Sequence, residues 1–136
     1  CLPKDTQQLL SNYKEIPNNI IDAAVKANQT RKKFIVDSII EKKPKVVGVY
    51  RLIMKNESDN FRDSAILDII DMLLDAKIRL KLFEPLIKSN QFRGVDVIED
   101  LSEFKDNSDL IIANRITKDL KSVMSKVYSR DIFGEN

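Results

Sequence analysis

Histidine is absent from this chain of 136 residues, and the chain contains a single cysteine and only three glycines. Histidine is the usual general base and the commonest metal ligand, so we expect no metal site. A single cysteine cannot form an internal disulfide, which favours a reducing, cytoplasmic compartment. The glycines are too far apart to form a G-x-G-x-x-G loop, so we expect any dinucleotide-binding loop to lie outside this sequence.

Long apolar runs and clusters of one charge are also missing. No apolar run approaches the roughly 20 residues needed to span a bilayer, and the N-terminus lacks the basic and apolar segments of a signal peptide. The 23 basic and 21 acidic residues are interspersed and leave a net charge of +2, whereas a dedicated nucleic-acid-binding domain carries clustered basic residues. We therefore expect neither a membrane nor a nucleic acid as a partner.

The length of 136 residues suits one compact domain with an additional helix or strand. Hydrophobic residues make up 43% of the chain, which is enough to build a core. The first residue is Cys1 rather than methionine. We therefore expect the chain to be a fragment or a processed product.

The N-terminal third of the chain favours helix. Residues 1–16 are interpreted as an irregular lead-in with a short helical piece at residues 7–13. Pro17 and the two asparagines after it form a helix start signal, and no helix breaker follows until Pro44. The predicted helix, residues 17–43, would be roughly 37 Å long at about 1.5 Å per residue. It could be a scaffold packed on a domain, or a spacer joining two domains or two subunits.

Beyond Pro44 the apolar pattern alternates between strand and helix. Strands are expected at residues 46–50, 78–83, 95–98, 110–113 and 126–130, and helices at residues 61–73, 101–105 and 117–125. Strands separated by helices imply βαβ units, a parallel sheet and right-handed crossovers. The sequence therefore predicts an α/β fold in which a long N-terminal helix precedes a parallel-sheet domain.

Basic side chains follow several of the predicted strands. They are Arg51, Lys55, Arg62, Arg115 and Arg130. In open parallel sheets ligands bind outside the carboxyl ends of the strands, and a helix predicted to begin near Asn60 adds unpaired N–H groups there. Such a set suits a ligand with two or more phosphates, although the cations could also be ordinary solvated loop charges. A receiver-like domain is excluded, because Tyr50 and Arg51 stand where it requires acids.

A second candidate site lies at the start of the chain, where Cys1, Lys4 and Asp5 fall within five residues. A thiolate is a strong nucleophile, and a neighbouring ammonium group favours it over the thiol. A nearby carboxylate can accept a proton or orient a water molecule. The alternative interpretation is a stray thiol on a frayed end, because so short a pattern often occurs by chance.

Three ordered motifs resemble the nucleotide-sugar 6-dehydrogenases, and the similarity covers the whole chain. Residues 1–6 resemble the family's catalytic cysteine motif. Residues 48–62 resemble the signature at the start of its UDP-binding domain. The sequence Tyr-Arg-Leu-Ile-Met-Lys within them is similar to that of a bacterial subgroup that acts on UDP-glucose. Residues 82–85 correspond to the family's Tyr-Asp-Pro, and residues 127–133 to its C-terminal end.

The resemblance implies a reaction. The family oxidises the C6 alcohol of a UDP-sugar to a carboxylate by two successive hydride transfers to NAD, which for UDP-glucose gives UDP-glucuronate. Cys1 would hold the sugar aldehyde as a thiohemiacetal and then as a thioester that water hydrolyses. Lys4 would lie near both cofactor and substrate, and Asp5 would activate or orient the water. This chain without an NAD-binding domain is expected to be inactive.

The resemblance also implies a fold and binding roles. Lys55 matches the lysine that contacts the UDP moiety, Arg62 the arginine that reaches NAD, and Arg130 a C-terminal arginine on the UDP side. Residues 1–16 would be the remnant of the catalytic loop, and residues 17–43 a central helix that links domains and builds a homodimer. Residues 44–136 would then be a Rossmann-like UDP-binding domain.

Two alternatives remain open. The chain could belong to another nucleotide-sugar 6-dehydrogenase, one that oxidises UDP-N-acetylmannosamine or GDP-mannose, although the wording of residues 50–54 disfavours this. It could also be a non-catalytic module for nucleotide binding or oligomerisation. An upstream G-x-G-x-x-G loop would favour an enzyme over such a module.

Overall fold

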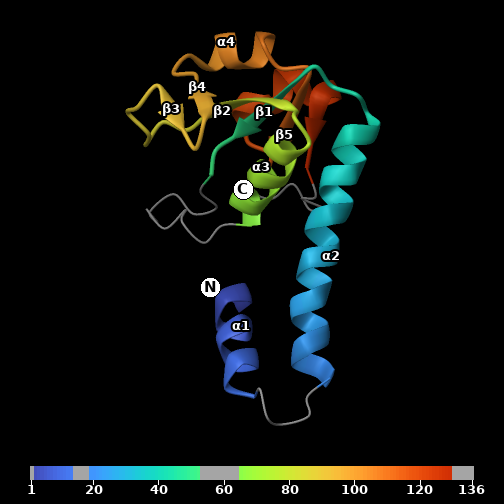
Figure 1. Cartoon of the computed structure of the whole chain (residues 1–136). Coiled ribbons are helices and arrows are strands. Elements are labelled where there is room, and N and C mark those ends of the chain that lie inside the picture. Colours follow the sequence, from blue (N-terminus) through green and yellow to red (C-terminus); the bar gives the residue numbers. More distant parts are fainter. Residues whose placement is uncertain (1, 14–18, 53–64, 130–136) are drawn as a thin grey trace.

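The computed structural model describes residues 2–13, 19–52 and 65–129, with side chains from Asp5 onward. It consists of an α/β body and two helices that extend away from it (Figure 1). In chain order the elements are α1 (Leu2–Asn12), α2 (Asn19–Glu41), β1 (Val46–Tyr50), α3 (Ala65–Asp75), β2 (Arg79–Phe83), β3 (Gln91–Phe92), β4 (Val95–Val97), α4 (Leu101–Asp106), β5 (Leu110–Ala113), the 3-10 helix η1 (Lys118–Lys126) and β6 (Val127–Tyr128).

A six-stranded sheet forms the centre of the body, in the order β3-β4-β2-β1-β5-β6. All neighbouring pairs are parallel except β3 and β4, so the predicted parallel sheet is confirmed. The sequence interpretation missed the antiparallel edge strand β3. The turn before β4 uses Arg93 (φ 52°) and Gly94 (φ 78°), and left-handed turns of this kind are usually signalled by Asn-Gly or Asp-Gly.

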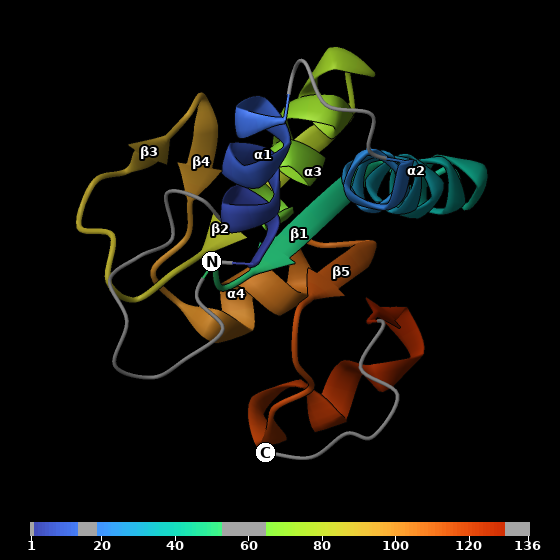
Figure 2. The same ribbon diagram turned by 90° about the horizontal axis from the view of Figure 1, so that it is seen from below.

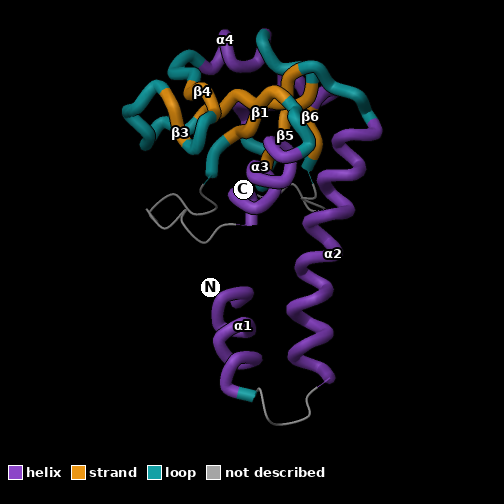
Figure 3. The backbone as a smooth tube through the Cα atoms, in the orientation of Figure 1, coloured by secondary structure: helices purple, strands orange, loops and turns teal. Residues whose placement is uncertain are grey.

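Helices cover both faces of the sheet, with α3 on one side and α4 on the other (Figure 3). On the first face Val49 of β1 packs in one core with Ile70 of α3 and Ile39 near the end of α2. On the second face Tyr50 packs with Phe104 of α4. Alternate residues of β1 therefore serve opposite cores, as a strand buried on both faces requires.

Gly48 sets how closely α4 approaches β1. A Cβ atom at this position would lie 2.4 Å from Ser108 Oγ and 2.7 Å from Phe104 Cζ. Both neighbours are buried, with 3% and 0% of their surface exposed. Because neither can move into solvent, no larger residue fits here without displacing α4.

The long helix is confirmed as α2, within two residues of the predicted bounds. Its buried side chains are Val36 and Ile39, near its C-terminal end. Its first half extends away from the body and runs beside α1 (Figures 1 and 2), and Ile20 there is 86% exposed. The α/β body therefore covers only the C-terminal part of α2.

Three predicted elements need correction. The lead-in is a helix that already begins at Leu2. Pro3 is tolerated there because the N–H groups of a first turn have no partner within the helix, so the N–H that proline lacks is not missed. The predicted helix at residues 117–125 is a 3-10 helix with a kink at Val123 (φ −126°, ψ 24°), a form common in short connectors. The last strand is only Val127–Tyr128, and Arg130 lies outside the described residues.

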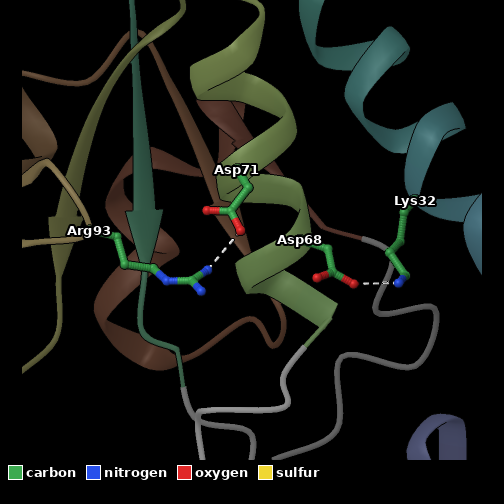
Figure 4. Close-up of polar contacts among 4 residues, drawn as sticks. All are labelled: Lys32, Asp68, Asp71 and Arg93. Atoms are coloured by element: carbon green, nitrogen blue, oxygen red, sulfur yellow. Dashed lines mark hydrogen bonds and ion pairs between the residues drawn. The ribbon is translucent and has the colours of Figure 1, made fainter.

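Two ion pairs tie α3 to its surroundings (Figure 4). Lys32 of α2 contacts Asp68, and Arg93 of the β3–β4 turn lies 2.8 Å from Asp71. Both carboxylates are about half exposed, so each pair contributes at most about 1 kcal/mol. They orient α3 against its neighbours rather than supplying most of the stability of the fold.

Within the described ranges, no helix combines the length and apolar character needed to cross a membrane. In those same ranges, no group of three or more His, Cys, Asp or Glu side chains could hold a metal ion.

Candidate functional site

The carboxyl ends of three parallel strands meet at one edge of the sheet. β1 lies between β2 and β5, and in the register Tyr50 pairs with both Phe83 and Ala113. The chain leads from β1 to β2 on one side and returns to β5 on the other, so strand order reverses at β1. In open α/β sheets this reversal is where ligands bind. The residues that follow the three strands therefore form the candidate site.

Arg51 follows β1 in a left-handed backbone conformation, with φ 59°. For a residue other than glycine this costs about 1–2 kcal/mol, so its surroundings must hold it. Its amide donates to the carbonyl of Phe83 at 2.8 Å. Its guanidinium carbon lies 5.4 Å from the centre of the Tyr50 ring, and an Nη atom lies 4.0 Å from the carboxylate of Asp119. Nε is buried and has no hydrogen-bond partner within the described part.

Tyr50 connects the end of β1 to the start of η1. Its hydroxyl donates to Asp119 Oδ2 at 2.9 Å and lies 3.0 Å from Thr117 Oγ1. Its ring stacks on Phe83 with 5.6 Å between centroids. Burial raises the pKa of Tyr50, the hydrogen bond with Thr117 lowers it, and that with Asp119 raises it again. The sequence interpretation used Tyr50 as the end of a strand, as part of a family signature and to exclude a receiver domain, but it missed this role.

Replacing Tyr50 with phenylalanine should change how stability depends on pH. The raised pKa means that the folded chain favours the neutral hydroxyl. This stabilisation is present below the unfolded-state pKa of about 10 and is lost as pH rises through the folded-state pKa. Wild type should therefore lose free energy of unfolding more steeply above about pH 10 than Tyr50→Phe does.

Urea denaturation across this pH range provides the measurement. Near neutral pH the variant should be about 1 kcal/mol less stable, because the hydroxyl's hydrogen bonds are lost. Tyr13→Phe, at a 36% exposed position, controls for removal of a tyrosine hydroxyl as such. Identical slopes for wild type and Tyr50→Phe in alkaline solution would contradict the role given to burial.

Glu84 follows β2 and is buried, with 4% of its surface exposed. One carboxylate oxygen accepts the amide N–H of Leu52 at 2.8 Å, and the other that of Leu86 at 3.3 Å. Its backbone carbonyl accepts the amide of Ile87 at 3.0 Å. Glu84 therefore joins the chain that leaves β1 to the chain that leaves β2. The sequence signals were its position between a strand and Pro85 and the correspondence of residues 82–85 to a family motif, and the sequence interpretation drew no role for Glu84 from them.

Asn114 and Arg115 follow β5. Asn114 is partly buried, and its Nδ2 atom has no hydrogen-bond partner among residues 2–13, 19–52 and 65–129. Arg115 is exposed. The prediction that Arg51 and Arg115 follow neighbouring strands at one rim is confirmed. With Arg51, these residues give the edge cationic and neutral donors, a chemistry that suits an anionic ligand.

Of the six residues to which the resemblance gives a catalytic or binding role, one has a described side chain. Asp5 is exposed in the first turn of α1, whose N-terminal end points towards the α/β body (Figure 1). Cys1, Lys55, Arg62 and Arg130 lie outside the described residues, as does the side chain of Lys4. The structure brings together Arg51, Glu84, Asn114 and Arg115 at one edge of the sheet. Only the order of residues in the sequence relates these four to the predicted residues that lie outside the described part.

Comparison with known proteins bears on this edge directly. Residues 48–134 match the UDP binding domain of the UDP-glucose/GDP-mannose dehydrogenase family. The chain is 46% identical to a UDP-glucose 6-dehydrogenase of Streptococcus pneumoniae and 51% identical to one of Campylobacter jejuni, in each case over 98% of this chain and 34% of the relative. It therefore spans about a third of the length of these relatives.

A solved structure agrees on the fold. The chain superimposes on a GDP-mannose dehydrogenase of Pseudomonas aeruginosa with a TM-score of 0.75, at 19% identity, over 95% of this chain and 34% of that protein. At so low an identity the likeness concerns the fold alone. The match over residues 48–134 shows that the chain belongs to the UDP-glucose/GDP-mannose dehydrogenase family and contains its UDP binding domain.

Proposed function

We propose that this chain is the UDP-sugar-binding part of an NAD-dependent UDP-glucose 6-dehydrogenase, which oxidises UDP-glucose to UDP-glucuronate. The observation that carries the proposal is the identity of 46% and 51% to two proteins of that name over nearly the whole chain. The alternatives, oxidation of UDP-N-acetylmannosamine or GDP-mannose, have weaker support, because the likeness to a GDP-mannose dehydrogenase is at 19% identity. The identities of 46% and 51% to proteins named UDP-glucose 6-dehydrogenase also disfavour a non-catalytic module.

Lys55 and Arg130 are proposed to bind the UDP moiety. In the sequence Lys55 follows β1, whose carboxyl end belongs to the candidate edge, and Arg130 follows β6, which runs parallel to β5. The described edge is suited to phosphates. It presents the donors of Arg51, Asn114 and Arg115, while the carboxylate of Glu84 already accepts two amides. Charge-assisted donors of this kind bind phosphate strongly.

Arg62 and Lys4 are proposed to contact NAD, whose pyrophosphate such cations fit. NAD supplies the hydride acceptor for both oxidations. In this proposal the residues of the chain bind and orient the substrate and hold the reacting carbon between the oxidations. The domain that would carry a G-x-G-x-x-G loop lies outside this sequence.

Cys1, Lys4 and Asp5 are proposed as the catalytic residues. After the first oxidation the Cys1 thiolate adds to the aldehyde carbon, and its C–S bond retains the sugar as a thiohemiacetal. The second oxidation leaves a thioester. Asp5 orients a water whose oxygen adds to the carbonyl carbon. The C–S bond then breaks, and the thiol and the free carboxylate are released. Lys4 favours the thiolate form of Cys1.

Turnover assays of the full-length protein test the proposal. With NAD and UDP-glucose we expect two NADH per sugar consumed and UDP-glucuronate as the product. UDP-N-acetylmannosamine and GDP-mannose serve as the matched comparison, and both should react at least about 10²-fold more slowly, since sites built around polar groups reject analogues strongly. Faster oxidation of either comparison sugar would reassign the substrate, and no NAD reduction with any of the three would refute the proposal.

A homodimer through α2 is also proposed. The first half of α2 and the neighbouring α1 leave large apolar side chains exposed, among them Ile20 at 86% and Leu9 at 43%. Burying such a patch against a second copy would remove it from water. Sedimentation of the full-length protein at micromolar concentration should give a dimer or larger, and Ile20→Glu should shift it towards monomer. A clean monomer for wild type would contradict this.

A further inference from the structure

Arg51 has a backbone strain that no turn explains. Within the described ranges, the residues other than glycine with a positive φ are Lys43, Arg51, Lys77 and Arg93. Lys43 and Lys77 lie where α2 and α3 end, and the amide of each donates back to the last turn of its helix, which is a common way to end a helix. Arg93 lies in the turn between β3 and β4. Of the four, only Arg51 lies neither at the end of a helix nor in a hairpin turn.

The left-handed conformation of Arg51 changes the side of the sheet on which its guanidinium lies. Successive side chains of a strand point to opposite faces, so an extended Arg51 would follow Val49 onto the face covered by α3. Instead the guanidinium carbon lies 5.4 Å from the centre of the Tyr50 ring, which packs on the face covered by α4. An Nη atom lies 4.0 Å from the carboxylate of Asp119. The strained backbone therefore brings a cation to the side of the edge on which η1 begins.

The contacts of Arg51 within the described part of the chain do not account for this strain. At 4.0 Å the ion pair with Asp119 is too long for a hydrogen bond. The two side chains are 37% and 47% exposed, so the pair stabilises the fold little. Nε of Arg51 is buried without a hydrogen-bond partner in that part, which adds a further cost. Strain that internal contacts do not explain is typical of ligand-binding positions.

Asn114 occupies the corresponding position on the neighbouring strand. Tyr50 pairs with Ala113, so Arg51 and Asn114 each come directly after one member of that pair. Nδ2 of Asn114 is also buried without a hydrogen-bond partner among the described residues. Two such donors at adjacent strand ends, where strand order reverses, indicate an acceptor that a ligand supplies.

We propose that Arg51 binds a phosphate group of UDP through its guanidinium, which the left-handed backbone and the Tyr50 ring hold in place. This inference rests on the proposed function and extends it to a residue that the family resemblance leaves without a role. A guanidinium suits this ligand because its planar set of donors matches phosphate oxygens and stays charged. The side chain is 37% exposed, so a ligand can reach it.

The test is titration of UDP, and separately of NAD, into the full-length protein carrying Arg51→Gly. Glycine adopts the left-handed conformation without strain, so this variant deletes the guanidinium and tolerates the same backbone path. The dissociation constant for UDP should rise at least about tenfold, equivalent to about 1.4 kcal/mol. That for NAD, whose phosphates are proposed to lie elsewhere, should change by less than about twofold, the usual scatter between uncoupled sites.

Uridine separates a lost phosphate contact from a disturbed site. It carries the same base and ribose as UDP but no phosphate, and ligand-detected NMR can follow its weaker binding. Its dissociation constant should change by less than about twofold in Arg51→Gly. Arg51→Asn should give the same pattern as Arg51→Gly, because asparagine also tolerates the left-handed conformation, and it replaces Arg51→Gly should that protein not fold.

Lys77→Gly is the matched control. It also replaces a left-handed, positively charged residue with glycine, at φ 57°, and Lys77 is exposed. Lys77 precedes β2, so it lies at the amino ends of the parallel strands, opposite the candidate edge. This variant should leave the UDP constant within about twofold of wild type.

Several outcomes would overturn the inference. They are an unchanged UDP constant in Arg51→Gly, equal weakening of UDP and uridine, a loss of NAD affinity as large as that of UDP, and an equal loss of UDP affinity in Lys77→Gly. If wild type binds UDP and Arg51→Gly binds it equally well, the inference fails alone and the proposed function stands. If wild type does not bind UDP, the proposed function fails and the inference fails with it.

Discussion

Turnover of the full-length protein should fall by about 10²–10⁴-fold, the range for losing a catalytic group, when Cys1 is replaced by serine. The thiolate is proposed to hold the aldehyde between the two oxidations and then to leave as water attacks the thioester. A serine oxygen is a weaker nucleophile and forms an ester that is harder to hydrolyse. The binding of UDP-glucose does not use the thiol, so its dissociation constant should stay near that of wild type.

Steady-state rates and calorimetry measure these two effects separately. Because an oxyester is hydrolysed more slowly than a thioester, intact-protein mass spectrometry of Cys1→Ser with substrate and NAD should reveal an acyl adduct. Cys1→Ala, which has no nucleophilic atom at this position, is the matched control and should show no adduct. Turnover of either variant within about tenfold of wild type would fall short of the loss expected for a nucleophile, and Cys1 would then be structural.

Removing Lys55 and removing Arg62 should have opposite consequences for the two ligands. A charge-assisted contact is worth about 1.5–3 kcal/mol, which corresponds to roughly 10- to 150-fold in affinity. Lys55→Ala should weaken UDP-sugar binding by this amount and NAD binding much less. Arg62→Ala should do the reverse, because it is proposed to reach the cofactor.

Lys121→Ala provides the charge-matched control. It removes one positive charge from an exposed position on η1 to which no UDP contact is assigned, so it reports the effect of net charge without the contact proposed for Lys55. A loss of UDP affinity as large as that of Lys55→Ala would mean that the ligand responds to the general positive charge of the domain. Equal effects of Lys55→Ala and Arg62→Ala on both ligands would show the assignment of the two residues to be wrong.

The central strands were predictable because they are buried on both faces. β1 and β5 are near-continuous apolar runs, which is how strands of a parallel sheet covered by helices appear in sequence. The pattern of α2 was equally clear, since Pro44 limits a long stretch without helix breakers. The edge strand β3 has only two residues and depends on the turn at Arg93, so no periodicity could reveal it.

The site was less predictable, because its contacts join residues that are remote in sequence. Glu84 holds an amide 32 positions away, and Tyr50 bonds to Asp119 across 69 positions. A pattern of apolar residues indicates where a strand ends in the sequence. Which strand ends are neighbours follows from the register of β1 with β2 and β5, which brings Arg51, Glu84 and Asn114 to one edge of the sheet. The domain boundaries at residues 16 and 43, and the roles of Cys1, Lys4, Asp5, Lys55, Arg62 and Arg130, stay predictions.

The central claim is that this chain carries the binding site for UDP, and titration of UDP into the full-length protein tests it most directly. We expect saturable binding by wild type, with a dissociation constant that Lys55→Ala raises by at least about tenfold, or about 1.4 kcal/mol. GDP, titrated in the same way, should bind more weakly than UDP. Absence of UDP binding, or one dissociation constant shared by wild type and Lys55→Ala, would contradict the account.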